Sequence, residues 1–218
     1  MVLDVLRNGI RRLTDTAGHG GEVASADTRD GTAGEPATIP ASDTRAADDV
    51  GAFELLAEDF ATYDHGLLEP GFWAVTAHRL GRRAAEVEAA PTRALLEAAY
   101  KLMFTGIDWV WGIHLPRTVD LGRRVRLWHN GCMLLTARAI GNDVHIRHDT
   151  TFGPLRGTAG TPQTLPVIED RADLGSGVCV LGGVRVGHDA VVGANSVVLK
   201  NVPPHATVLG VPARIVPT

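Results

Sequence analysis

The second half of the chain carries an aliphatic or other large apolar side chain at every sixth position. One unbroken series is Ile168, Leu174, Val180, Val186, Val192 and Val198. An earlier series with the same step and one extra residue after its fourth member is Leu115, Leu121, Leu127, Met133, Ile140, Ile146 and Phe152. A period of six matches neither the α-helical repeat nor the two-residue alternation of a strand. It predicts a coil with three short flat faces, whose apolar residues point inward and whose successive turns stack.

Two further features of the repeat favour this coil. Glycine follows the apolar residue at positions where we expect unusual dihedral angles or close approach of the backbone: Gly122, Gly141, Gly153, Gly175, Gly187 and Gly193. The residue four positions after the apolar one is usually small or β-branched, as in Val125, Val144, Ala172, Val178 and Ala190. A β-sandwich with chance periodicity is the alternative, and the unbroken series argues against it.

The register is lost between Phe152 and Ile168, whose separation is not a multiple of six. Residues 153–166 (GPLRGTAGTPQTLP) are rich in glycine, proline and threonine. They predict a loop extruded from the coil, and loops of this length on a rigid scaffold are usually functional or disordered.

The residues before the coil divide into two regions. Within residues 49–112, large apolar side chains recur at helical spacing, with breaks at Gly66, Pro70 and Pro91, which predicts two or three helices. Residues 1–48 consist mostly of small and polar residues after a short apolar stretch at residues 2–14. We expect this segment to be mostly disordered with at most one short helix, followed by an α-helical domain and then the coil at residues 113–218.

Composition excludes several classes of protein. The 218 residues carry a formal charge of -4, so no basic excess is present to neutralise nucleic-acid phosphates. No apolar run reaches the roughly 18 residues that a membrane-spanning helix needs. Two cysteines, Cys132 and Cys179, do not make a disulfide scaffold, and the first residues lack the apolar core of a signal peptide. We therefore expect a cytoplasmic protein with no nucleic-acid or membrane partner.

Three stretches of the chain resemble the hexapeptide-repeat acyltransferases, specifically their serine O-acetyltransferase-like branch. Residues 70–82 (PGFWAVTAHRLGR) are similar to the helical segment before the coil, and residues 125–129 (VRLWH) lie where that family has its catalytic histidine. Residues 192–216 (VGANSVVLKNVPPHATVLGVPARIV) resemble the last coils and the C-terminal exit. The resemblance covers about residues 50–218.

The resemblance implies a left-handed parallel β-helix that assembles as a homotrimer or a dimer of trimers. It implies a reaction in which acetyl-CoA or another acyl-CoA donates its acyl group directly to a small acceptor, without a covalent acyl-enzyme and without a metal. His129 is then the general base that takes a proton from the acceptor hydroxyl, a role that suits the pKa of imidazole. The sequence does not identify the acceptor, the length of the acyl chain or whether oxygen or nitrogen is acylated.

The chain departs from the family pattern around the expected catalytic histidine. An aspartate that orients this histidine in the family aligns with His114, so His114, Asp108, Asp120 or a backbone carbonyl could orient His129. Orientation of the base is therefore left open.

Three further positions bear on the acceptor. The family has an aspartate before the catalytic histidine, where this chain has Trp128, and an Arg-His pair in the extruded loop, which aligns with Thr164 and Leu165. Replacing these charges removes what a zwitterion needs, so the expected acceptor is a less polar or bulkier molecule than free serine. Asp64 is a candidate match to a substrate-binding aspartate in the family's helical domain.

The family lays CoA in a groove between neighbouring β-helices, where small residues allow close approach. Gly153, Ser176 and Ala194 align with such positions, although Pro154 replaces the second residue of a glycine pair. Lys200 and Arg214 are candidates to meet the CoA phosphates, and Arg156 is a weaker one. A solvated surface charge is the alternative for each of these basic residues.

Two competing interpretations remain. The γ-class carbonic anhydrases use the same repeat and bind zinc through histidines at a subunit interface, and His129, His145, His148 and His188 supply enough imidazoles. A trimeric scaffold whose site has decayed is the other alternative. The helical region and the residue 70–82 stretch favour the acyltransferase.

Overall fold

The computed structural model describes residues 47, 50–64, 66–129, 131–156 and 160–217. The predictions for residues 1–46, a disordered segment with a short helix, lie outside the described residues. Every element described below belongs to the unit that spans Pro36–Thr218.

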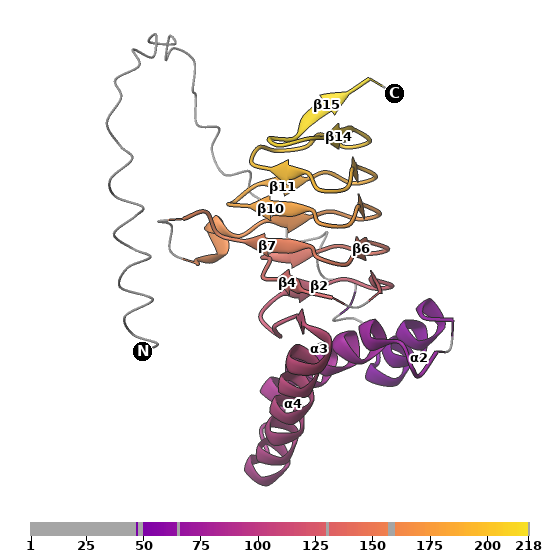
Figure 1. The fold of residues 1–218 in the computed structure, drawn as a ribbon. Helices are drawn as coiled ribbons and strands as arrows, with labels where there is room; N and C mark the ends of the chain where they lie inside the picture. Colours follow the sequence, from indigo (N-terminus) through magenta and orange to yellow (C-terminus); the bar gives the residue numbers. More distant parts are fainter. Residues whose placement is uncertain (1–46, 48–49, 65, 130, 157–159, 218) are drawn as a thin grey trace, which may run out of the picture. The chain divides into compact units, whose positions relative to one another are not determined.

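Within the described residues, three helices precede the coil, in agreement with the two or three expected from the sequence: α2 (Ala52–Thr62), α3 (Pro70–Glu86) and α4 (Ala90–Trp111) (Figure 1). Helices α3 and α4 each have a proline in their first turn, where its missing N–H would have no helical partner anyway. Helix α4 ends at Gly112, whose φ of 65° places it in the left-handed region that favours glycine. None of the described helices combines the length and hydropathy that a bilayer span requires.

The second half of the chain is the predicted left-handed parallel β-helix, built from three sheets of very short strands (Figure 1). The first sheet contains β1 (Ile113–His114), β4 (Met133–Leu135), β7 (Thr151–Gly153), β10 (Cys179–Leu181) and β13 (Val197–Val198). The second contains β2 (Asp120–Leu121), β5 (Ala139–Ile140), β8 (Val167–Ile168) and β11 (Arg185–Val186). The third contains β3 (Arg126–Trp128), β6 (His145–Arg147), β9 (Asp173–Leu174), β12 (Val191–Val192), β14 (Thr207–Leu209) and β15 (Arg214–Val216).

Strand pairing is parallel throughout these sheets except at β15, which pairs antiparallel with β14. Each strand pairs with the strand one coil away. A side chain at one position of a coil therefore lies beside the side chain at the same position of the next coil. This stacking brings residues about 19 or 28 positions apart in the sequence into columns along the helix.

The core of the β-helix consists of the residues of the six-residue period. Every member of both apolar series is at most 2% exposed, from Leu115 to Val198. Val125, Val144 and Val178, each four residues after a member of the series, are also buried, whereas Val184 is partly buried. Each fully buried aliphatic side chain contributes about 1.5–3 kcal/mol, so the column of apolar residues is the main source of stability for this part of the chain.

Close approach of neighbouring coils, rather than unusual dihedrals, explains the glycines of the repeat. A Cβ added at Gly122 would lie 2.7 Å from the amide nitrogen of Asn142 on the next coil, and one added at Gly175 would lie 2.5 Å from that of Ala194. Gly153 is the exception, because nothing lies within 4 Å of an added Cβ there. Left-handed backbone occurs two residues after the glycine position instead, often at Asp or Asn, which tolerate it.

The coil is interrupted between β7 and β8, where the chain leaves the stack (Figure 1). The described part of this excursion contains the short 3-10 helix η2 (Pro162–Thr164). Strand β7 lies in the stack before the excursion and β8 lies in it afterwards. The coils on the two sides of the excursion therefore keep the same register.

Partly buried polar contacts join helices α2 and α3 to the first coil. Glu58 of α2 accepts bonds from Arg123 at 2.8 and 2.9 Å and from Arg124 at 2.8 Å, and these two guanidinium groups hold the pKa of Glu58 below its usual value. Arg79 of α3 donates to the carbonyl oxygens of Leu121 and Gly122 at 2.8 and 2.6 Å. The helices therefore have a defined position against β2 and β3.

The buried imidazole of His78 makes a third contact between the helices and the coil. Its Nε2 lies 2.9 Å from the carbonyl oxygen of Val119, and burial lowers the pKa of His78 to about 3. The ring is therefore neutral at physiological pH and donates one hydrogen bond to the coil.

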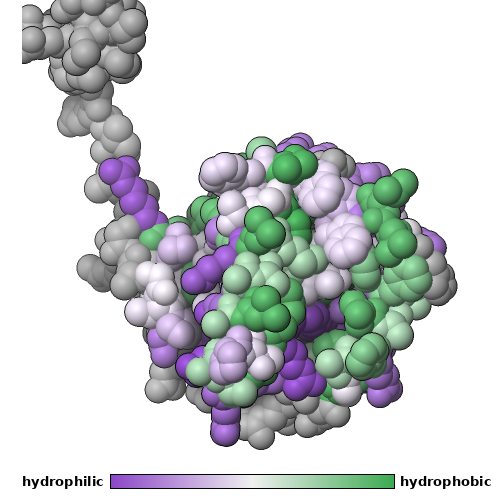
Figure 2. Space-filling view, turned by 90° about the horizontal axis from the view of Figure 1, so that it is seen from below, coloured by the Kyte–Doolittle hydropathy of each residue, from purple (hydrophilic) through white to green (hydrophobic). Residues whose placement is uncertain are grey.

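Helix α4 leaves much of its apolar surface exposed. Figure 2, viewed from the helical end, shows apolar side chains gathered on this face of the molecule, and α4 contributes exposed Leu95, Leu102, Trp109 and Val110. Contiguous exposed apolar surface of this kind often marks a protein–protein interface.

The close-approach explanation makes a paired prediction. Gly122→Ala should lower the free energy of unfolding by about 1–3 kcal/mol, because the new methyl group overlaps the next coil. Gly153→Ala, which introduces the same methyl group into open space, should change it by less than about 0.5 kcal/mol. Denaturant unfolding followed by circular dichroism measures both, and equal effects would contradict the explanation.

Candidate active site

One corner of the coil brings together three of the residues that the sequence predicts for the site. At the turn from the third sheet to the first, the residue two positions after the inward apolar residue forms a column, which we call the histidine corner: His129, His148, Ser176 and Ala194. The strand register explains the column, because Leu127 pairs with Ile146, Ile146 with Leu174, and Leu174 with Val192. The predicted base and two predicted CoA-contacting residues therefore lie on one edge.

His129 and His148 are in direct ring contact on neighbouring coils. Their ring centroids are 5.7 Å apart, with the planes inclined at 68°. His129 is exposed and has a left-handed φ of 64°. In His148, Nδ1 is buried without a hydrogen-bond partner, and Nε2 lies 4.0 Å from a carboxylate oxygen of Asp149. An exposed imidazole thus packs against a second one whose buried Nδ1 has no hydrogen-bond partner among the described residues.

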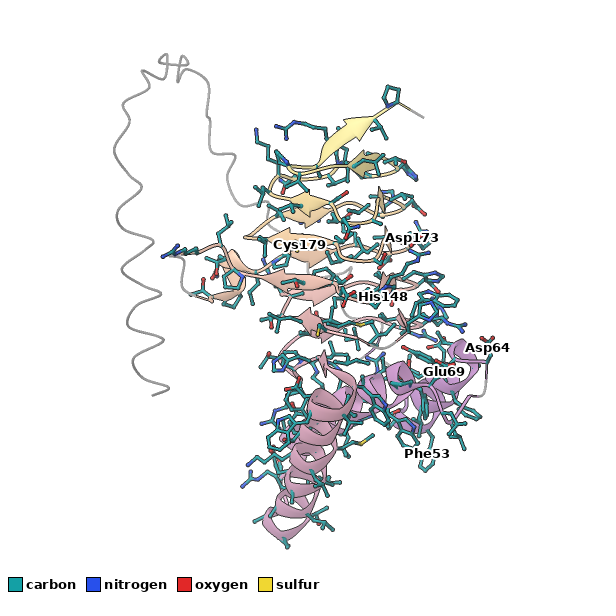
Figure 3. All side chains as sticks on the ribbon, in the orientation of Figure 1. Phe53, Asp64, Glu69, His148, Asp173 and Cys179 are labelled. Carbon is teal, nitrogen blue, oxygen red and sulfur yellow. The ribbon has the colours of Figure 1, made fainter. Side chains whose placement is uncertain are left out.

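The role of His148 in this pair was missed by the sequence reasoning, which considered it only as a zinc ligand. The signal was present, since His148 follows Ile146 by two positions just as His129 follows Leu127. Figure 3 shows His148 on the coil side of the helices, with Asp64 below it near the end of α2.

Trp128 lies beside His129 under a guanidinium group. The Cζ atom of Arg126 is 4.0 Å from the centroid of the Trp128 ring, a cation–π arrangement. The indole Nε1 of Trp128 is buried and has no hydrogen-bond partner. The residue that precedes His129 is therefore covered by a guanidinium group and has one donor without a partner among the described residues.

Asp64 reaches this region only through Arg126. One of its carboxylate oxygens accepts a bond from Nη2 of Arg126 at 2.6 Å, while Nη1 of Arg126 donates to the carbonyl oxygen of Thr62 at 2.8 Å. Asp64 thus holds the guanidinium that covers Trp128. The structure brings Asp64 and Trp128 into one cluster through Arg126, an arginine that the sequence analysis did not consider.

A buried tyrosine positions the strand that carries these residues. The hydroxyl of Tyr63 accepts a bond from the backbone N–H of Leu127 at 2.9 Å and donates to the carbonyl oxygen of Val125 at 3.3 Å. Burial raises the pKa of Tyr63, which stays protonated. Tyr63 follows α2, so the helical region sets the position of Trp128 and His129.

The predicted orienting group, His114, is engaged elsewhere. Its Nδ1 lies 3.2 Å from a carboxylate oxygen of Asp108, and its ring packs edge-on against Phe104. Asp120 is on the second sheet, 4.0 Å from Arg82. Among the described contacts, none joins His114, Asp108 or Asp120 to His129, and the ring contact of His129 within one chain is with His148.

The remaining predicted residues occupy a different edge or the C-terminal strand. Gly153 ends β7, Leu165 follows η2, and Lys200 follows β13, so these three lie at the turn from the first sheet to the second. We call this edge the loop corner. Arg214 is exposed on β15, and Pro154 and Arg156 are exposed in the excursion after β7. Within one chain, the predicted acceptor and CoA residues are divided between two corners.

The histidines of the zinc alternative do not form one cluster. His129 contacts His148, His145 packs against Trp128 at a centroid distance of 5.7 Å, and His188 lies at a third corner of the coil. Within the described part of the chain, the one group of three potential ligands with mutually close donor atoms is His188, Asp189 and His205.

The chain is similar in sequence and in structure to known proteins that are named serine acetyltransferase. The serine acetyltransferase of Mycobacterium tuberculosis is 36% identical over 148 residues, which cover 67% of this chain and 61% of that protein. The serine acetyltransferase of Bacillus pumilus is 32% identical over 176 residues, covering 75% and 77%. The crystal structure of Brucella abortus serine acetyltransferase in complex with coenzyme A superposes with a TM-score of 0.62 at 27% identity, covering 75% of this chain and 67% of that one.

The similarity has a limited extent. Several of the curated relatives are longer, and the chain spans about 50–61% of the length of the first of them. No protein-family model matches the chain.

The role of Tyr63 can be tested by removing its hydroxyl. Tyr63→Phe leaves the buried N–H of Leu127 unpaired and should lower the free energy of unfolding by about 1–3 kcal/mol. Tyr100→Phe is the matched control, because its hydroxyl lies 3.5 Å from the Arg117 amide and contributes little. Chemical denaturation measures both variants, and a Tyr63→Phe protein as stable as the parent would contradict the assignment.

Proposed function

The chain belongs to the serine acetyltransferase family of hexapeptide-repeat acyltransferases, and on that premise we propose that it transfers an acetyl group from acetyl-CoA to the hydroxyl group of a small acceptor. The observation that carries the proposal is the histidine corner, where an exposed imidazole shares one edge of the coil with two small residues. Homologous proteins named for this activity and a structural neighbour solved with coenzyme A support it.

In this reaction His129 is the general base. Its neutral imidazole takes the proton of the acceptor hydroxyl as the oxygen attacks the thioester carbonyl of acetyl-CoA. The tetrahedral intermediate collapses by breaking the C–S bond, and the imidazolium returns the proton to the departing thiolate of CoA. The products are the acetyl ester and free CoA, and His129 ends the cycle neutral.

His148 is a positioning residue for His129 in this proposal. The ring of His148 packs against that of the base, which restricts the orientations the base can adopt. Its buried Nδ1 has no hydrogen-bond partner among the described residues. This arrangement supplies what His114 would otherwise have provided, since His114 is bound to Asp108.

The donor site requires more than one chain. Ser176 and Ala194 offer small side chains at the histidine corner, while Gly153, Lys200 and Arg214 lie on other parts of the coil. A homotrimer in which the histidine corner of one protomer faces the loop corner of its neighbour would bring these groups to one CoA molecule. The exposed apolar face of α4 supports an assembled state, including a dimer of trimers.

We propose further that the acceptor carries no ammonium group. The family's aspartate beside the base is replaced by Trp128, and Arg126 covers that indole at 4.0 Å. The guanidinium occupies the indole face that could otherwise hold an ammonium ion by a cation–π contact, and the nearby carboxylate of Asp64 is already paired with Arg126. Leu165, where the family has a charged loop residue, adds apolar surface from the loop corner. Free serine is therefore a poor acceptor, although the relatives bear its name.

The catalytic assignment makes a quantitative prediction. His129→Ala should lower the rate of acetyl transfer by about 10²–10⁴-fold with little change in CoA affinity, because only the proton-transfer step is lost. His148→Ala should lower kcat less than His129→Ala does, and His148→Gln should recover part of the loss. Release of CoA from acetyl-CoA, followed with a thiol reagent, gives the rates, and unchanged circular dichroism shows that the variants fold.

Two results would contradict this assignment. Equal rates in His129→Ala and the parent would remove the general base. A parent chain that binds no CoA and transfers no acetyl group to any tested acceptor would favour the non-catalytic scaffold.

The acceptor proposal is tested with a panel of related alcohols. Serine, ethanolamine and 3-hydroxypropanoate differ only in which charged groups flank the hydroxyl, and a neutral sugar carries neither. We expect kcat/KM to be higher for 3-hydroxypropanoate or the sugar than for the two ammonium compounds. Trp128→Asp combined with Leu165→His should raise kcat/KM for serine, and a parent enzyme that prefers serine over the whole panel would contradict the proposal.

A further inference from the structure

The third corner of the coil carries a separate cluster of two histidines and an aspartate. His188 and Asp189 lie in the turn from β11 to β12, and His205 lies in the corresponding turn one coil further on. Nδ1 of His188 is 2.8 Å and Nδ1 of His205 is 3.7 Å from the same carboxylate oxygen, Oδ2 of Asp189. All three donor atoms lie within 4.8 Å of one another.

This cluster ends a column of alternating charge. The residues with left-handed backbone at this corner are, on successive coils, Arg124, Asp143, Arg171, Asp189 and His205. Arg124 pairs with Asp143 through two hydrogen bonds, and Arg171 pairs with Asp189 through two bonds of 2.7 Å. In this column His205 is the residue that follows Asp189, and its Nδ1 lies 3.7 Å from Oδ2 of that carboxylate.

The donor set suits a particular class of cation. Two imidazole nitrogens and one carboxylate oxygen match zinc and other late first-row divalent metals, whereas magnesium and calcium prefer oxygen ligands. Tetrahedral coordination at about 2.0–2.2 Å from each ligand requires donor atoms roughly 3.3 Å apart. The distances from Asp189 Oδ2 to the two imidazoles fall on either side of this value.

The backbone holds the ligands in place. The amide N–H of His205 donates to the carbonyl oxygen of His188 at 2.9 Å, and the amide N–H of His188 donates to Glu169 at 2.9 Å. Arg185 in turn contacts the other carboxylate oxygen of Glu169. Only side-chain rotations are therefore needed to close the three donors on one ion.

Arg171, the cation paired with Asp189, does not prevent a metal ion from binding to the same carboxylate. Arg171 donates from Nε to Oδ1 and from Nη2 to Oδ2 of Asp189, and its side chain is 54% exposed. Oδ2 has a second lone pair, which faces His188. A metal there would replace the proton on Nδ1 of His188, and the exposed guanidinium would keep Asp189 oriented toward the ion.

We propose that His188, Asp189 and His205 form a binding site for a divalent transition metal such as Zn²⁺, separate from the histidine corner and independent of the proposed function. The ion joins two successive turns near the C-terminal end of the β-helix. Its role is structural, because it fastens the turn at His205 to the coil below.

Zinc titration of the full chain tests this site. After chelator treatment, the parent should bind one Zn²⁺ per chain by isothermal titration calorimetry, and Zn²⁺ should raise its melting temperature by mass action. His188→Gln and His205→Gln should each weaken zinc binding by at least about tenfold, the effect expected for loss of a supporting group and more so of a ligand. Both variants should lose the zinc-dependent rise in melting temperature.

His145→Gln is the matched control, since it removes a coil histidine outside the cluster and should leave zinc affinity unchanged. A parent chain that binds no zinc would overturn the proposal. Zinc binding that survives in both cluster variants and is lost in His148→Gln would instead assign the metal to the histidine corner, and would also overturn it.

Discussion

The burial of one apolar side chain per six residues is the constraint on which the rest of this structure depends. Each coil encloses such residues at its three faces, and none of those in the two apolar series is more than 2% exposed. Because a slip of one residue would turn an inward side chain outward, burial determines the register between coils. The register then determines which outward residues share a column. His129 and His148 meet because Leu127 and Ile146 are paired inside.

The same constraint explains why chemistry collects at the corners. Strands of two or three residues leave little outward surface, so the turns carry most of the polar side chains. One corner holds two imidazoles and small residues, another holds the extruded segment, and the third holds the charged column from Arg124 to His205. A trimeric arrangement would let an edge of one protomer meet a different edge of its neighbour. Division of the predicted site between edges is then a consequence of the fold.

Much of the fold was predictable from the sequence, because the six-residue period directly records burial. The three helices followed from apolar spacing and from Pro70 and Pro91. His129 came from a resemblance carried by residues 125–129, and the column with Ser176 follows once the register is known. The bond between His114 and Asp108 was not predictable, since it depends on how α4 meets the first strand. The stacking of Arg126 on Trp128 likewise depends on Asp64, which the end of α2 brings to β3.

The central claim is that coil register builds the catalytic edge at His129. A crystal structure of the full chain with CoA bound tests it most directly. The account predicts the CoA thiol beside the imidazole of His129, with the pantetheine arm along Ser176 and Ala194 and a second protomer on the far side of the groove. CoA bound away from this edge, or wholly within one protomer at another corner, would contradict it.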